Sequence, residues 1–204
     1  LYIERSQGIF TCCGNEFYKN KIWKNTDTDK EIKEVHTYCK YSNKFEPPTD
    51  LESFLMEKVE NSLFSIKTDN HIENRGSMIN FSVVGRDCTQ EERNKYFEWD
   101  NKNSERKQIV KDILLKFKTL EASIGGQISI DIHEPGMDKS QIFHHIKKDF
   151  QGLIDEINFI GDRTMEGGND YPLAKLMNEK KPICQVYQTE GPENTEQILK
   201  EIND

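Results

Sequence analysis

The sequence has no long apolar run, and its apolar content is modest. Apolar side chains make up 34% of the 204 residues and charged side chains 31%. No stretch approaches the roughly 20 apolar residues that a membrane-spanning helix needs. The N-terminal Leu-Tyr-Ile-Glu-Arg-Ser also lacks the apolar core of a signal peptide. These absences predict a soluble, cytoplasmic protein with one or two modest cores and no contact with a membrane.

Cysteine pairs with a chelating or redox spacing are also missing. The chain has five cysteines, an odd number, and no Cys-x-x-Cys motif. A disulfide framework is therefore not expected, and a reducing compartment fits the sequence better. Cys12, Cys13, His36 and Cys39 could in principle gather a zinc ion, but two adjacent cysteines have the wrong spacing for the usual pair of ligands.

An excess of positive charge is absent as well. The formal net charge is −8, which argues against a general nucleic-acid binder, because affinity for a phosphate backbone comes from clustered Lys and Arg. A small anionic ligand is still possible, but in an acidic protein it needs a local basic pocket. The arginines between residues 75 and 93 are the candidates for such a pocket.

An apolar run ends at an acidic residue near the C-terminal end of the chain. The run includes Leu153 and Ile160 and predicts a buried strand, which stops at Gly161-Asp162. The loop Gly167-Gly-Asn-Asp170 then brings a second acid. In an open α/β sheet the carboxyl ends of the strands form the ligand crevice, so this region is a candidate Mg²⁺ site. The alternative is that Asp162 caps the next turn, as many Gly-Asp pairs do.

The hydrophobic patterns divide the chain into two parts. Residues 16 to about 135 predict a small α+β module with an antiparallel sheet, and from residue 139 helices and strands alternate as in the end of a parallel α/β domain. A parallel domain of only two strands is too small to stand alone. The helices expected in the first part span residues 30–40, 51–59, 89–93 onward and 107–117, and the strands span residues 63–68, 78–84, 121–124 and 127–132.

Five sequence blocks together carry a family resemblance. The chain is similar, from about Arg75 to Asp170, to eukaryotic-type phosphomannomutases of the haloacid dehalogenase superfamily. The resemblance implies a partial Rossmann-like core plus an α+β cap domain with an antiparallel sheet. The implied domains are a core fragment (1–15), the cap (16–136) and the C-terminal part of the catalytic core (137–204). The blocks are Ser77–Arg86, Cys88–Arg93, Gly125–Asp131, Gly136–Ser140 and Gly161–Asp170.

The family's N-terminal motif is not found in these residues. Members begin with a strand that ends in Asp-x-Asp-Gly-Thr, in which the first Asp is the nucleophile and the second the acid/base. Here Asp27-Thr-Asp29 follows a polar segment and is interpreted as a helix cap. Either a preceding segment is lacking from the chain, or the protein is a truncated relative without its nucleophile; the Leu at position 1 favours the first. The chain alone is expected to be inactive.

The resemblance also implies roles for individual residues. Lys139 would stabilise the transferring phosphoryl group, Asp162 and Asp170 would hold Mg²⁺, and Asn169 would orient the metal's surroundings. For these groups the alternatives are an exposed lysine at a helix start and simple loop capping. The cap would bind the sugar phosphate through Arg75, Arg86, Arg93, Ser129 and Asp131. The arginines could instead be solvated surface charges, and Asp131 could orient Arg86 or Arg93 rather than touch substrate.

The implied activity is the interconversion of mannose 6-phosphate and mannose 1-phosphate for GDP-mannose biosynthesis. It would use an aspartyl-phosphate, Mg²⁺ and a hexose 1,6-bisphosphate activator, in a homodimer formed through the cap. The alternatives are a capped sugar phosphatase and a non-catalytic sugar-phosphate-binding relative. Two departures stand out: Arg163 and Glu166 replace the family's Lys and Pro, and the residues after Asp170 lack the Phe-x-Asp-x-x-Thr pattern of a second cation site.

Overall fold

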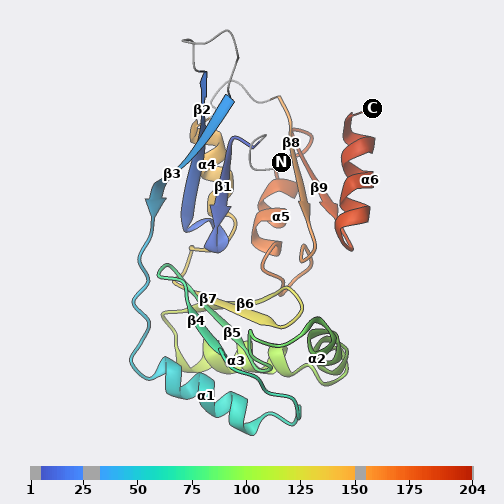
Figure 1. The fold of residues 1–204 in the computed structure, drawn as a ribbon. Coiled ribbons are helices and arrows are strands. Elements are labelled where there is room, and N and C mark those ends of the chain that lie inside the picture. Colours follow the sequence, from blue (N-terminus) through green and yellow to red (C-terminus); the bar gives the residue numbers. More distant parts are fainter. Residues whose placement is uncertain (1–5, 25–32, 150–154, 204) are drawn as a thin grey trace.

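The computed structural model describes residues 6–24, 33–149 and 155–203. In these residues six helices and three sheets form a mixed α/β structure (Figure 1). The sheets are an antiparallel β1-β2-β3, an antiparallel β4-β5-β7-β6 and a parallel pair β8-β9. The predicted fold class, an α/β core portion plus an α+β cap with an antiparallel sheet, is confirmed.

The four-stranded sheet is covered by helices on one face only. Its strands are β4 (Ile72–Asn74), β5 (Ile79–Ser82), β6 (Glu121–Gly125) and β7 (Ser129–His133). The helices α1 (Leu51–Asn61), α2 (Gln90–Asn103) and α3 (Glu105–Lys116) lie beneath it in Figure 1, on the side away from the other two sheets. The opposite face is left for the rest of the molecule and for a ligand.

Strand alternation decides what each face of this sheet presents. Successive side chains of a strand point to opposite faces. Phe81 pairs with Ile130 and Ile79 with Ile132, and all four are buried in the core with residues of α1, α2 and α3. The residues between them are polar and therefore point to the face without helices. One continuous core thus sits between the sheet and its helices.

The parallel pair and its helices form the second half of the structure. The strands are β8 (Ile157–Gly161) and β9 (Cys184–Gln188), and the helices are α4 (Gln141–Asp149), α5 (Tyr171–Asn178) and α6 (Pro192–Asn203). A small apolar cluster of Phe143, Leu173, Met177 and Cys184 joins α4 and α5 to the sheet. This arrangement agrees with the predicted alternation of helix and strand after residue 139.

The N-terminal residues form a separate sheet of three strands. They are β1 (Gly8–Thr11), β2 (Glu16–Lys24) and β3 (Lys33–Ser42), with the short helix η2 (Cys12–Gly14) between the first two. The expected domain boundary between residues 15 and 16 falls inside this sheet, because β1 pairs with β2.

Two secondary-structure predictions, for residues 30–40 and 63–68, are wrong. The helix expected over residues 30–40 is a strand from Lys33 onward, since β3 pairs with β2 along the whole of β2. The Asp27-Thr-Asp29 segment lies outside the described residues. The strand expected over residues 63–68 is irregular, although its end is attached through the Thr68 amide, which donates to the Val84 carbonyl at 2.9 Å.

No helix in the described residues combines the length and the apolar character that crossing a bilayer requires. This finding agrees with the absence of long apolar runs in the sequence.

Candidate functional site

The face of the four-stranded sheet that carries no helix is lined by polar side chains. The register sets Glu73 beside Asn80 and Asn80 beside Asp131, and Ser82 lies beside Ser129 in the next row. The sequence-based expectation that Ser129 and Asp131 share one side of their strand follows from the same alternation. Asn80, Ser82, Ser129 and Asp131 are all buried, so this face is shielded from bulk water.

Two of the three predicted arginines meet on one carboxylate. The Nη2 and Nε atoms of Arg75 donate to Oε2 of Glu73 at 2.6 and 3.0 Å, and Nε of Arg86 lies 3.6 Å from the same oxygen. Partial burial lowers the pKa of Arg75, but the hydrogen bond and charge of Glu73 outweigh it, so the pKa is raised. Sequence reasoning missed Glu73, although it stands only two residues before Arg75.

Arg86 and Arg93 complete the basic cluster. Nη1 of Arg86 donates to the Ser129 hydroxyl at 3.1 Å, which brings together two residues predicted to bind substrate. Nη2 of Arg93 donates to the carbonyl oxygen of Arg86 at 3.1 Å. Arg75, Arg86 and Arg93 are all half-buried.

Asp131 connects the cap sheet to the loop that follows β8. Its Oδ1 accepts from Nδ2 of Asn80 at 2.7 Å and its Oδ2 accepts from Nδ2 of Asn169 at 2.8 Å. The thiol of Cys13 lies 3.8 Å from Oδ2. These contacts hold Asp131 in place between the arginine cluster and the candidate metal loop.

Two buried oxygens on the same face have no partner among the described residues. They are Oδ1 of Asn80 and Oγ of Ser82. A buried polar atom without a hydrogen bond is costly, and in native structures it often marks a place that a ligand or water completes. Both residues lie on strand β5: Ser82 pairs directly with Ser129, which accepts from Arg86, and Asn80 pairs with Asp131.

Lys139 and Asp170 form an ion pair on the core side. Nζ of Lys139 donates to Oδ1 of Asp170 at 2.5 Å, and the Arg163 amide donates to Oδ2 of Asp170 at 2.9 Å. Burial lowers the pKa of Lys139, but attraction and hydrogen bonding by Asp170 outweigh it and raise the pKa. The lysine is therefore a fixed cation. A Cβ at Gly161 would lie 2.7 Å from Oδ2 of Asp170, so only glycine allows the strand this close.

Asp162 follows β8 directly and is exposed. It lines an open cavity of about 720 Å³ together with Lys139 and Asp170. A free carboxylate beside a fixed lysine fits a hard cation that shares its remaining ligands with a phosphate. Asp170 has both oxygens engaged, although each carboxylate oxygen has a second lone pair. The described residues hold no cluster of three or more His, Cys, Asp or Glu ligands, so Asp162 and Asp170 would supply only part of the cation's shell.

The loop from Asp162 to Asp170 is attached to the cap at the edge of β6. Ile124 donates to the carbonyl of Gly167 and accepts from the amide of Asn169, each at 3.1 Å, in a parallel bridge between Ile124 and Gly168. Arg163 donates to the Gly126 carbonyl at 2.6 Å. The missing side chain of Gly125 makes room here, since a Cβ would lie 2.9 Å from Oδ2 of Asp131.

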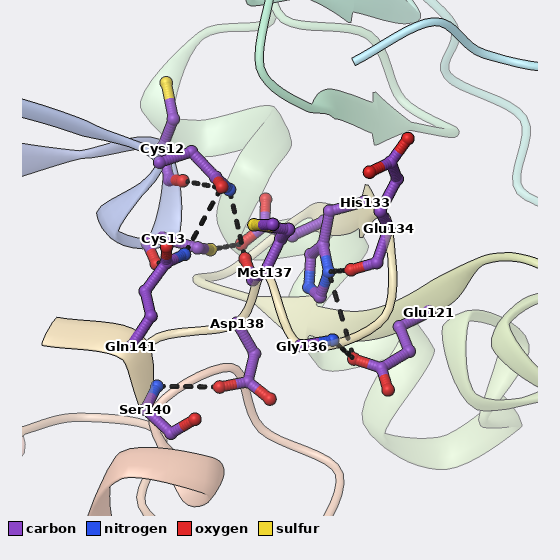
Figure 2. A network of polar contacts seen from close by, with 12 residues as sticks. Cys12, Cys13, Glu121, His133, Glu134, Gly136, Met137, Asp138, Ser140 and Gln141 are labelled. Atoms are coloured by element: carbon purple, nitrogen blue, oxygen red, sulfur yellow. Dashed lines mark hydrogen bonds and ion pairs between the residues drawn. The ribbon is translucent and has the colours of Figure 1, made fainter. Parts of the chain in front are cut away.

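The segment between β7 and α4 carries Lys139, and Figure 2 shows the polar contacts of the residues around it. Its Gly136 amide donates to Glu121 at 3.3 Å and its Ser140 amide to Asp138 at 2.7 Å. Gln141 at the start of α4 donates to the Cys13 carbonyl at 3.0 Å. These bonds fix the position from which Lys139 reaches Asp170.

A buried arginine that sequence reasoning missed supports the turn between β6 and β7. Arg106 is 2% exposed, and its Nε donates to Asp100 at 2.7 Å. Its Nη1 donates to the carbonyls of Gly125 and Gly126 at 3.0 and 3.2 Å. Its place in α3 gave no signal, because an arginine within a charged helix ordinarily faces solvent.

Comparison with known proteins gives one family. The sequence profile of the family described as "Eukaryotic phosphomannomutase" matches residues 26–204. A protein named phosphomannomutase from Encephalitozoon cuniculi is 38% identical over 162 residues, which are 78% of this chain and 58% of that protein. A probable phosphomannomutase from Caenorhabditis elegans is 34% identical over 76% of this chain and 59% of its own length.

A phosphomannomutase from Drosophila melanogaster is 38% identical over 67% of this chain and 52% of its own length. The chain thus spans somewhat more than half the length of the curated relatives it matches. The residues matched by the family profile, 26–204, include both the four-stranded sheet and the parallel pair.

Proposed function

Because the chain belongs to the eukaryotic phosphomannomutase family, we propose that this protein interconverts mannose 6-phosphate and mannose 1-phosphate. The reaction would pass through an aspartyl-phosphate and a hexose bisphosphate. The 204 residues contain no Asp-x-Asp-Gly-Thr motif, so we also propose that they are inactive without that motif. Lys139 and the Asp162 carboxylate then serve the phosphoryl group that is transferred, and the cap arginines hold the other phosphate.

One observation carries this proposal: three side-chain contacts, linked through β7 and the loop after β8, connect the two charged clusters. Arg86 contacts Ser129, and Asp131, two residues further along β7, bonds to Asn169. Asn169 precedes Asp170, which pairs with Lys139. A sugar bisphosphate needs an anion site at each end and polar groups between them. Here the polar face of the sheet lies between the basic cluster and the Lys139 cluster.

The proposal includes the partners of the reaction. When bound, Mg²⁺ would neutralise charge on the transferring phosphoryl group, with Asp162 and Asp170 as ligands and Asn169 orienting the loop. A hexose 1,6-bisphosphate would act as activator. We further propose a cytoplasmic homodimer formed through the cap that supplies GDP-mannose biosynthesis, without nucleic acid or membrane partners. These additions rest on family membership and on the net charge of −8.

The test is a mutase assay of the full-length protein with Mg²⁺ and mannose 1,6-bisphosphate, followed by ³¹P NMR. We expect conversion of mannose 1-phosphate to mannose 6-phosphate, and a loss of at least tenfold in kcat/KM for Arg86→Ala, because a charge-assisted phosphate contact is removed. Arg86→Lys serves as the charge-preserving control, because lysine keeps the positive charge without the guanidinium group. Absence of turnover on both mannose and glucose phosphates would overturn the proposal.

Two alternatives give different results in the same assay. A capped sugar phosphatase releases inorganic phosphate faster than it isomerises the sugar. A non-catalytic binding relative shows no turnover, but binds mannose phosphate without metal in a manner that depends on Arg86 and Arg93.

A further inference from the structure

Glu73 occupies the arginines that are proposed to hold the substrate's far phosphate. One of its oxygens, Oε2, receives both Nε and Nη2 of Arg75 and lies near Nε of Arg86. Arg75 therefore donates Nε and Nη2 to a carboxylate, although the same two groups could donate to a phosphate. The Glu73 side chain is 44% exposed, so water and a ligand can both reach this contact.

The charge balance of the cluster explains why a carboxylate lies there. Arg75 and Arg86 are two like charges held close together by neighbouring strands and loops, and an empty site leaves them without a counter-ion. Glu73 supplies one negative charge in that state. A phosphate dianion that enters the same place supplies more charge and more acceptors, but it also repels the carboxylate.

We propose that the Glu73 carboxylate competes with the phosphate for Arg75 and Arg86. Glu73 pairs with these arginines whenever the phosphate leaves. The proposal rests on the proposed function and assigns to the same site a residue that governs release. A bisphosphate intermediate must turn end for end, so its outer phosphate has to be released and rebound in every cycle. A carboxylate that stabilises the empty arginines lowers the cost of that release.

The opposite role for Glu73 is that of an orienting residue that strengthens phosphate binding. The two roles predict opposite changes in phosphate affinity when the carboxylate is removed. Loss of an orienting carboxylate weakens phosphate binding, whereas loss of a competing carboxylate strengthens it. The competing role is favoured because an exposed carboxylate orients weakly, while its repulsion of a dianion at the same guanidinium groups is direct.

The experiment is calorimetric titration of the full-length protein with inorganic phosphate. We expect Glu73→Gln to bind phosphate about tenfold more tightly than the unmodified chain, which is the size expected for removing one repulsion between nearby charges at a protein surface. Glu60→Gln is the matched control, since Glu60 is exposed on α1 and its substitution changes the net charge equally. Arg86→Ala should weaken phosphate binding both in the unmodified protein and in the Glu73→Gln variant. Circular dichroism verifies that each variant is folded.

The outcomes separate this proposal from the proposed function. Weaker or unchanged phosphate binding by Glu73→Gln, in a chain whose binding still requires Arg86, overturns the competing role and leaves the arginine site intact. If phosphate binding is absent or does not depend on Arg86, then the arginine site itself is wrong and both proposals fail. In the full-length enzyme the competing role also predicts a lower KM together with a lower kcat for Glu73→Gln.

Discussion

Cys13 illustrates how position within the site changes the chemistry of a single side chain. It is buried beside Asp131, and burial together with the negative charge of Asp131 raises the pKa of its thiol. The thiolate is the reactive form of cysteine. The neighbouring position in sequence, Cys12, is less buried, so the adjacent pair does not behave as one unit.

At pH 8 we therefore expect iodoacetamide to alkylate Cys13 far more slowly than Cys39, which is exposed on β3. Peptide mass spectrometry of a time course measures both rates in one sample. In 8 M urea the two rates should converge, because unfolding removes the burial. Similar rates in the folded protein would contradict the burial of Cys13 against Asp131.

Lys139 gives a prediction for pH dependence. Its pKa is raised in the folded state, so its ion pair with Asp170 contributes stability that is fully present below the unfolded pKa of about 10.4. That contribution is lost as the pH rises through the higher, folded pKa. Lys139→Met should therefore lower the free energy of unfolding by about 2 kcal/mol at pH 7, and this deficit should shrink above about pH 10.5.

Urea unfolding at pH 7, 9 and 11 measures that deficit. Lys175→Met is the control, because Lys175 is exposed on α5, and its effect should be small at each pH. A deficit for Lys139→Met that grows with pH would show that the sign is wrong.

Motifs identify candidate residues one block at a time, whereas contacts between blocks appear only in the structure. Arg86 and Ser129 were predicted from separate blocks, and the structure brings them to 3.1 Å. Glu73 and Arg106 belong to no motif and were missed. Glu73 contacts Arg86 from a separate segment, and Arg106 reaches the turn between β6 and β7 from α3, so no local pattern encodes these contacts.

At the scale of elements, strand alternation was the most reliable guide. It placed Ser129 and Asp131 on one side of β7, and the pairing with β5 then extends that polar face. The helix expected over residues 30–40 failed for the opposite reason. Apolar residues at helical spacing were outweighed by backbone pairing with β2, which is a non-local effect that spacing within one segment cannot reveal.

The sequence predicts a helix from residue 89 onward, and α2 begins there with a full capping box formed by Thr89 and Glu92. The Glu92 amide donates to the Thr89 hydroxyl at 3.3 Å, and the Thr89 amide donates to the Glu92 carboxylate at 2.7 Å. The hydrogen bond from the Thr89 backbone lowers the pKa of Glu92. Arg93 lies in the first turn of this helix, so the cap also fixes the position of Arg93.

Thr89→Ala should lower the free energy of unfolding by about 1 kcal/mol, because it removes the acceptor for the Glu92 amide. Thr89→Ser retains a hydroxyl and should lose much less. Urea unfolding followed by circular dichroism compares the two variants. Equal losses would mean that the methyl group of threonine matters more than its hydroxyl.

At the scale of the whole molecule, the two halves are joined at the loop from Asp162 to Asp170. The sequence predicted the loop and its acids but not its attachment to β6, because that attachment uses backbone atoms of Ile124 and Gly167. Backbone hydrogen bonds between distant segments leave no trace in residue type. The glycines at positions 125 and 168 are the only local sign of a close approach there.

Asn169→Ala should loosen this attachment, since it removes the bond to Asp131. We expect faster amide hydrogen exchange at Ile124 and at position 169, by about fivefold, because the lost bond contributes roughly 1 kcal/mol. Asn178→Ala on α5, where Asn178 is exposed, is the matched control. Unchanged exchange at Ile124 would indicate that the backbone bridge holds without the side chain.

The bridge between Ile124 and Gly168 ties the position of the acidic loop to that of the cap. The loop that carries Asp162 and Asp170 pairs with β6. The four-stranded sheet therefore cannot move away from β8 without pulling on both acids. Under the proposed function, admission of water to the site and displacement of these acids would be one event.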